Sequence, residues 1–228
     1  MSALERKPLR DQIRREIRDE ASASYVFTDS ELNTKINNAI RAYSKQIPHE
    51  VKATLSLVAN QADYAAPEDL RDVVEIKVGT AEYEVTEIFG GLLTLSPTPG
   101  ASASATFKYR AGHTLPTADS GTGSASTYDP IDEPLIVKHV TAQCWETLAG
   151  DGAKYYDYQE GDIRENQGKT QEQFRKEADK LFVEFDAGVA ESKAALLARR
   201  PTITRTMAAV VGRKKPTTSM TIYKDLRP

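Results

Sequence analysis

The histidines and the lone cysteine are the side chains whose chemistry could support catalysis. His139 and Cys144 have the residue types of a thiol–imidazole pair, and both fall in a segment of helical pattern. Five residues of α-helix turn through about 500°, which leaves the two side chains about 140° apart and on different faces. Cys144 is instead in register with Val140 and Leu148, which predicts a small core residue and not a nucleophile.

Metal and phosphate chemistry lack the residue patterns that they require. His49 and His113 have no partner at a ligand spacing, and one cysteine is too few for a structural zinc site or an internal disulfide. The glycines of residues 121–124 (GTGS) lack the lysine and the following helix of a phosphate-binding loop. The sequence therefore predicts no catalytic residues, no metal site and no cofactor, and it favours a protein that is not an enzyme.

The composition is typical of a subunit of a larger assembly. The chain has 228 residues, and its hydrophobic fraction of 39% is low for a compact enzyme domain. A thin subunit whose neighbours complete its core would have this composition. No apolar run reaches the roughly 18 residues that a membrane span needs, so we expect no membrane partner. The charged residues 1–7 also lack the apolar stretch of a secretory signal.

Charge is distributed unevenly along the chain. Residues 199–228 hold eight basic residues and one acid, Asp225, for a net charge of +7. Because the whole chain carries −3, residues 1–198 carry −10. An acidic body with a basic tail predicts an interaction arm that binds a neighbouring protein. The contact residues expected in this arm are Arg199, Arg200, Ile203, Arg205, Met207, Val210, Arg213, Lys214, Lys215, Met220, Ile222, Tyr223 and Leu226.

Apolar residues at helical spacing predict four helices within the acidic body, residues 1–198. The first begins near Leu9, and the second begins at a capping box, Thr28 to Glu31, and ends before Pro48. These two form an α-hairpin. A third helix follows Pro130 and ends near residue 150, and a fourth, the longest, runs from about 170 to 197.

Between the second and third helices the pattern changes to period two. Alternating or continuous apolar runs separated by Gly and Pro turns predict a small antiparallel sheet of four or five strands. The expected strands are residues 51–58, 73–78, 82–88, 92–95 and 105–109.

These elements define an α+β fold. Residues 1–48 and 128–198 are expected to form a helical bundle, made of the N-terminal α-hairpin and the two later helices. The antiparallel β-domain, residues 50–112, is inserted into it. Residues 113–127 are expected to be a flexible loop because they are small and polar, and residues 199–228 an extended arm.

Two stretches resemble those of the head-to-tail adaptor (connector) proteins of tailed bacteriophages. One is ATLSLVANQADYAAPEDLRDVVEIKV, residues 53–78, in which a strand leads through a Tyr and Pro-x-Asp-Leu turn into a second strand. The other is YYDYQEGDIRENQGKTQEQFRKEADKLFVEF, residues 155–185, which leads into the long final helix. In this stretch Tyr155, Tyr156, Gly161 and Asp162 match the pattern of the family. The resemblance covers residues 9–195.

The resemblance implies a structural protein of the virion neck, made in the host cytoplasm. Members form a ring, here expected to have twelve subunits, that docks beneath the portal protein and extends the channel for genome ejection. The implied partners are the portal, neighbouring adaptor subunits and the stopper or tail proteins. Double-stranded DNA passes through the lumen without sequence-specific binding. The family has no catalytic residues and no cofactor, and a terminal arm often clasps the portal.

Two alternatives stay open at this point. The protein could be another neck or tail component, such as a stopper or tail terminator, but those proteins are dominated by strands. It could also bind nucleic acid through its basic tail, although Tyr223 is the only aromatic residue there and the acidic body would repel phosphate.

Overall fold

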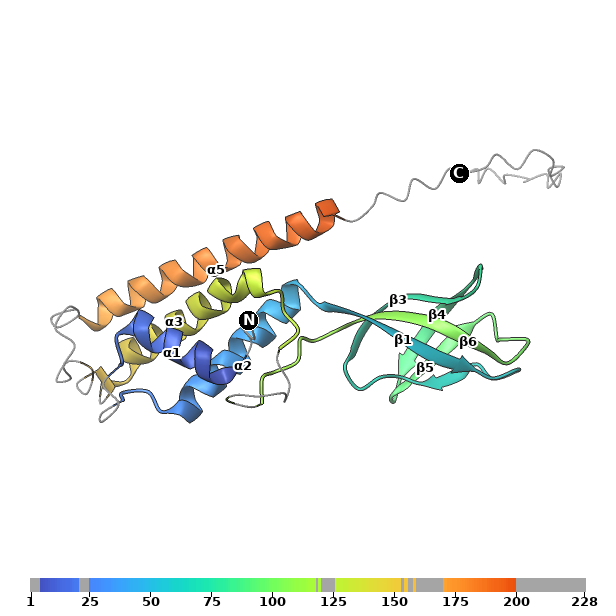
Figure 1. The fold of residues 1–228 in the computed structure, drawn as a ribbon, viewed down its shortest axis with the longest axis horizontal. Helices are drawn as coiled ribbons and strands as arrows, with labels where there is room; N and C mark the ends of the chain where they lie inside the picture. Colours follow the sequence, from blue (N-terminus) through green and yellow to red (C-terminus); the bar gives the residue numbers. More distant parts are fainter. Residues whose placement is uncertain are drawn as a thin grey trace, which may run out of the picture.

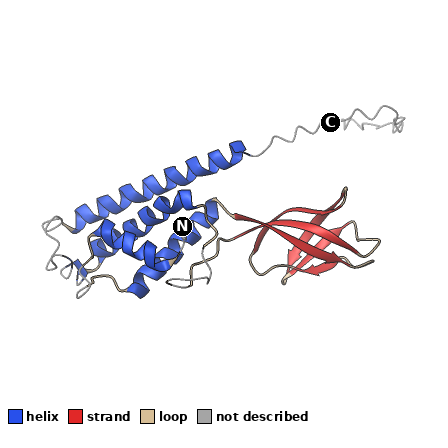
Figure 2. Cartoon of the chain, in the orientation of Figure 1, coloured by secondary structure: helices blue, strands red, loops and turns tan. Residues whose placement is uncertain are grey.

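The computed structural model describes residues 5–20, 25–117, 119, 126–152, 154, 155, 158 and 170–199. Among these residues there are four α-helices, gathered at one end, and six β-strands at the other (Figures 1 and 2). The α+β class predicted from the sequence is therefore confirmed. Within the described part of the chain, no helix combines the length and apolarity needed to cross a membrane.

The first two helices bury the faces that their periodicity predicts. In α1 (Arg6–Ile17), Leu9 and Ile13 are fully buried. α2 (Asp29–Gln46) begins at the predicted capping box, in which the Thr28 hydroxyl accepts a hydrogen bond from the Glu31 amide at 3.3 Å. The Glu31 carboxylate in turn accepts from the Thr28 amide at 2.8 Å, so both backbone donors are satisfied.

The two later helices pack side by side (Figure 1). A short 3₁₀ turn, η1 (Pro130–Asp132), leads into α3 (Glu133–Gly150), and α5 (Gln171–Arg199) is the longest helix described. Gly188 of α5 lies against Leu135 of α3, whose side chain occupies the space that a Cβ at position 188 would need. The apolar residues at helical spacing in both helices contribute to the core, with Leu181 partly buried and the others buried. They are Ile136, Val140, Cys144 and Leu148 in α3, and Phe174, Ala178, Leu181, Phe185 and Val189 in α5.

An aromatic cluster joins the helices at the end far from the sheet. Trp145 of α3 stacks on Phe174 of α5 with ring centroids 5.1 Å apart, and Tyr158 meets both rings edge-on. The Tyr158 hydroxyl donates a hydrogen bond to the Ile17 carbonyl at 3.0 Å, which connects this cluster to the end of α1.

The six strands form one antiparallel sheet in the order β1-β6-β3-β4-β5-β2. The strands are β1 (His49–Leu57), β2 (Asp63–Ala65), β3 (Leu70–Val78), β4 (Ala81–Phe89), β5 (Leu92–Ser96) and β6 (Ala103–Ala111). The five predicted strands are present, but the expected number was too low. β2 was missed because three residues are too few to show an alternating pattern.

The sheet curls because β3 and β4 pair over a short distance. Only Ile76–Val78 pair with Ala81–Tyr83, after which β4 pairs with β5. The curl brings Leu93 and Leu95 of β5 into the same buried cluster as Phe107 of β6. Gly90 and Gly91, both at positive φ, form the tight turn between β4 and β5, as their sequence predicts.

The sheet is attached to the C-terminal end of α2. Arg71 of β3 donates to the Ser44 carbonyl at 2.9 Å, and the His113 amide donates to the Ser44 hydroxyl at 3.1 Å. Of the predicted flexible loop, residues 118 and 120–125 lie outside the described residues. The Asp119 carboxylate accepts a hydrogen bond from Arg10 of α1 at 2.7 Å.

A buried ion pair closes the connection between α1 and α2. The Arg14 guanidinium lies 2.9 Å from the Asp19 carboxylate, and these residues are only 4% and 1% exposed. Arg14 also donates to the Phe27 carbonyl at 2.9 Å and pairs with Asp29 at 2.8 Å. Asp19 accepts the Val26 and Phe27 amides at 2.9 and 3.1 Å, so its oxygens have three donors.

We expect Asp19→Ala to lower the free energy of unfolding by about 3 kcal/mol, because the buried Arg14 guanidinium loses its buried carboxylate partner and the Val26 and Phe27 amides lose their acceptor. Chemical denaturation followed by circular dichroism measures this loss. The matched control is Glu20→Ala, which removes an exposed carboxylate at the next position and should stay within about 0.5 kcal/mol of the parent protein. Equal stability of the two variants would contradict the role given to the pair.

Candidate interaction surfaces

The residues considered for catalysis are separated in the structure. Cys144 is fully buried in the helical core, and burial raises the pKa of its thiol to about 12. The His139 ring lies against Phe185 and Phe182 of α5, with ring centroids 4.5 and 5.2 Å away. Its Nδ1 is 2.7 Å from the Gln143 amide nitrogen. The cysteine is therefore protonated at neutral pH, and the histidine packs against aromatic rings.

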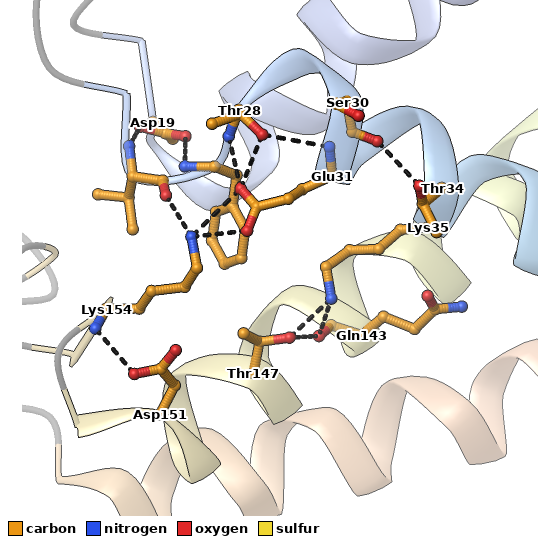
Figure 3. A network of polar contacts seen from close by, with 12 residues as sticks. Asp19, Thr28, Ser30, Glu31, Thr34, Lys35, Gln143, Thr147, Asp151 and Lys154 are labelled. Atoms are coloured by element: carbon orange, nitrogen blue, oxygen red, sulfur yellow. Dashed lines mark hydrogen bonds and ion pairs between the residues drawn. The ribbon is translucent and has the colours of Figure 1, made fainter.

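A polar cluster at the start of α2 was not predicted (Figure 3). Lys154 donates to the Val26 carbonyl at 2.8 Å and pairs with Glu31 at 2.9 Å. Lys35 donates to the Gln143 carbonyl at 2.9 Å, and burial lowers the pKa of this lysine. Because both ammonium groups bind protein oxygens, the cluster joins α2 to α3 and to the residues after it, and we assign it to the stability of the fold.

A groove of about 670 Å³ lies where the helices meet the sheet. His49 and His113, which the sequence left without partners, line it with ring centroids 5.6 Å apart. His113 Nε2–H donates to the Ile47 carbonyl at 2.9 Å, and the Thr127 hydroxyl is 3.1 Å from Nδ1. Burial lowers the pKa of His113, which keeps the ring neutral. The far wall is formed by Lys193, Leu196 and Leu197 of α5.

A second groove, of about 900 Å³, lies between β3 and β4 where the two strands separate. We call it the β3–β4 groove and define it by residues 72–77 and 82–88. Its charged side chains are Asp72, Glu75, Glu82, Glu84, Glu87 and Lys77. Lys77 and, from β6, Lys108 and Arg110 form ion pairs with Glu75, Glu82 and Asp72, so the negative charge left unpaired among the described residues of the groove is that of Glu84 and Glu87.

Apolar side chains are exposed on the helical face formed by η1 and α5. Ile131 is 75% exposed, Val183 is 70% exposed and Leu197 is 54% exposed. A shallow groove of about 300 Å³ runs beside Ile131 and is also lined by Pro134 and Leu135. Exposed apolar side chains of this size are candidates for protein contacts, and Ile131 has the shallow groove beside it.

Of the predicted arm, residues 199–228, the structure describes the first residue. Arg199, expected to be its first residue, is the last residue of α5, so the helix extends past its predicted end near residue 197. The other contact residues of the arm, from Arg200 to Leu226, lie outside the described residues.

Comparison with known proteins gives the class of this chain. A family model described as SU10 adaptor protein matches residues 7–190, which is most of the chain. No curated protein matches it. The chain therefore belongs to the SU10 adaptor family, a family of phage head-to-tail adaptor proteins. This confirms the resemblance inferred from residues 9–195.

Membership in the family fixes the broad function. The protein is a phage structural adaptor, and the family is not a class of enzymes. Association with other components of the neck and capsid, and a location in the virion neck, follow from the same membership.

Burial of Cys144 predicts a thiol that reacts only when the protein unfolds. A thiol reagent at neutral pH should label the folded protein very slowly and the protein in denaturant completely, because the thiolate is disfavoured and sterically covered. Cys144→Ser should lower the free energy of unfolding by about 1 kcal/mol, since a buried thiol becomes a hydroxyl without an assured partner. Rapid labelling of the folded protein would contradict this description.

Stability should also decrease as the pH falls from 7 to 5.5. Burial lowers the pKa of both His113 and His139, so in this range the unfolded chain binds protons that the folded chain does not. The stabilisation is complete above the unfolded value of about 6.5 and is lost on further acidification. The free energy of unfolding, measured by chemical denaturation at several pH values in this range, should fall more steeply with decreasing pH for the parent protein than for the double variant His113→Gln/His139→Gln. If the free energy of unfolding of the double variant fell equally steeply with decreasing pH, the two histidines would not be the source of the effect.

Proposed function

We propose that this protein forms a ring of twelve subunits beneath the portal at one capsid vertex. The ring extends the DNA channel and links the capsid to the stopper or tail proteins. The observation that carries the proposal is the match of residues 7–190 to the adaptor family. Helices hold more of the described residues than strands do, which supports an adaptor over the strand-dominated stopper and tail terminator proteins.

The exposed apolar surface supports subunit association. Ile131 and Val183 lie on the helical part, and Val74, Ile88 and Phe89 are 45%, 50% and 79% exposed on the sheet. In a ring both ends of the subunit would face neighbours, and burial of these side chains would supply contact area.

Charge supports the passage of DNA. An acidic body lining the channel would repel phosphate, so double-stranded DNA would slide through without sequence-specific binding. The basic arm is then available for proteins, and its acidic partners are on the portal or on an adjacent adaptor subunit.

We also propose that the chain is divided into two domains and an arm. The helical part, residues 1–48 and 128–198, acts as one bundle around a single buried cluster. The inserted β-domain, residues 50–112, has its own buried cluster. Residues 199–228 act as the arm.

Negative-stain imaging of the protein mixed with the portal of the same genome tests the proposal. Added density at the narrow end of the portal, with twelvefold symmetry, is the expected result. Sedimentation of the isolated protein at micromolar concentration should give a monomer or a weak oligomer, since each contact between subunits is small and charged. A stable ring without portal, or unchanged portal particles in the mixture, would refute it.

Removal of residues 199–228 should leave a folded, soluble body that no longer docks on the portal. Folding is expected to persist because the buried clusters lie within residues 9–189. Circular dichroism and co-sedimentation with portal particles measure the two outcomes.

The matched control is a full-length chain in which the same residues, 199–228, are shuffled, so that length and charge are retained. Docking by the shuffled chain would assign the effect of the arm to charge alone. Docking by the truncated chain with unchanged affinity would remove the arm from the mechanism.

A further inference from the structure

The β3–β4 groove is bordered by two strand edges that face each other. Leu70–Lys77 of β3 pair with β6, and Glu84–Phe89 of β4 pair with β5, on the sides away from the groove. Between β3 and β4 themselves the pairing stops after three residue pairs, the last of which is Ile76 with Tyr83. An extended segment that enters such a gap can pair its backbone with a strand edge, as in β-strand addition.

The side chains around the gap define the chemistry of that segment. Val74 and Ile88 are half exposed and would cover alternate apolar side chains of an added strand. Glu84 and Glu87 are exposed and form no ion pair within the described part of the chain. The segment should therefore have strand propensity, alternate apolar residues and adjacent positive charge.

Residues 213–224 of this chain, RKKPTTSMTIYK, have these properties. Met220 and Ile222 alternate with polar residues over 217–224, which is rich in threonine and other strand formers. Arg213, Lys214 and Lys215 come directly before it, and Pro216 stands where an added strand would begin, a position that tolerates proline.

The length of the arm indicates whose groove it reaches. Lys193, near the end of α5, and Arg110 of β6 line the same groove at the junction, and Arg110 donates to Asp72 at 2.8 Å. The chain that leaves α5 therefore starts near the Asp72 end of its own β3–β4 groove. Residues 200–216 can extend to about 55–60 Å, far more than this short path requires. The additional length would allow residues 217–224 to reach the β3–β4 groove of the next subunit.

We propose that residues 217–224 of one subunit add a strand to the β3–β4 groove of a neighbouring adaptor subunit. The inference rests on the proposed ring and identifies the neighbour contact of its arm. Each subunit gives one strand and receives one, so the contact is head-to-tail and closes around a ring. Arg213–Lys215 approach the acids of the groove and set the direction of the strand, while backbone pairing and the burial of Met220 and Ile222 give the affinity.

Disulfide capture with a synthetic peptide tests the docking itself. Full-length Glu87→Cys protein is mixed with an excess of the peptide of residues 213–228 carrying Thr221→Cys, under mild oxidation. Cys144 is buried and does not compete for the disulfide. The expected result is rapid capture that slows about tenfold or more when the peptide also carries Met220→Asp and Ile222→Asp, because both apolar contacts are lost.

Two controls define the specificity of capture. Asp179→Cys places the thiol on an exposed position of α5, away from the sheet, and should capture the peptide slowly. Glu84→Lys added to the Glu87→Cys protein should slow capture, whereas Glu20→Lys, which changes charge equally at an exposed site far from the groove, should not. Equal capture by Glu87→Cys and Asp179→Cys proteins would overturn the docking site.

Mixing full-length chains then distinguishes the neighbour from the same subunit. Glu87→Cys and Thr221→Cys proteins are combined, with and without portal, and analysed on non-reducing gels. A covalent dimer from the mixture supports the exchange between subunits. A third protein carries both Glu87→Cys and Thr221→Cys. If this protein forms an internal disulfide while the mixture of single variants gives no dimer, the arm fills its own groove, and the proposal is overturned.

Portal binding of the same samples separates this inference from the proposed function. Rings that form on the portal without a disulfide dimer would refute the strand exchange and leave the adaptor function intact. Peptide capture and dimer formation without any portal binding would support the strand exchange and count against the proposed docking to the portal.

Discussion

The ion pair between Arg14 and Asp19 is the constraint on which the arrangement of the helices depends. A charge buried without partners would cost several kcal/mol, so the Arg14 guanidinium needs acceptors when α1 lies against α2. Asp19 supplies the buried carboxylate, beside Asp29 and the Phe27 carbonyl, and it also accepts the Val26 and Phe27 amides, which positions the chain just before the capping box of α2. With the two helices set at one angle, their apolar faces form a single surface for α3, and α5 covers α3 in turn.

Local pattern was enough to predict most of the elements. The four helices and five of the six strands could be predicted because each buries one face, which the spacing of apolar residues records, and the capping box at Thr28 depends on residues three apart. The Arg14–Asp19 pair could not be found in this way, because charged residues in an amphipathic helix normally indicate the solvent side. The approach of His49 to His113 was missed for a related reason, since it depends on β1 and β6 lying side by side, which no local pattern specifies.

The candidate surfaces divide between the two ends of the chain according to chemistry. The helical end presents apolar side chains on η1 and α5, while the sheet presents an acidic groove between separated strands. Neither surface has the converging donors and nucleophiles of an active site, and the family match assigns the chain to structural adaptors. Sequence reasoning identified the basic arm but could not identify a receptor for it, because the groove exists only where the curl of the sheet opens β3 from β4.

The first and last residues of the inserted sheet lie side by side. His49, the first residue of β1, lies opposite Ala111, the last residue of β6, in the strand register. The chain therefore leaves the helical core and returns to it through two adjacent strand ends, much as it would through a short loop. Strands could be lengthened, shortened or exchanged during evolution without moving α2 relative to α3. The same closure has a consequence during synthesis: α1 and α2 leave the ribosome first, and their apolar faces stay uncovered until the entire sheet and then α3 have been made.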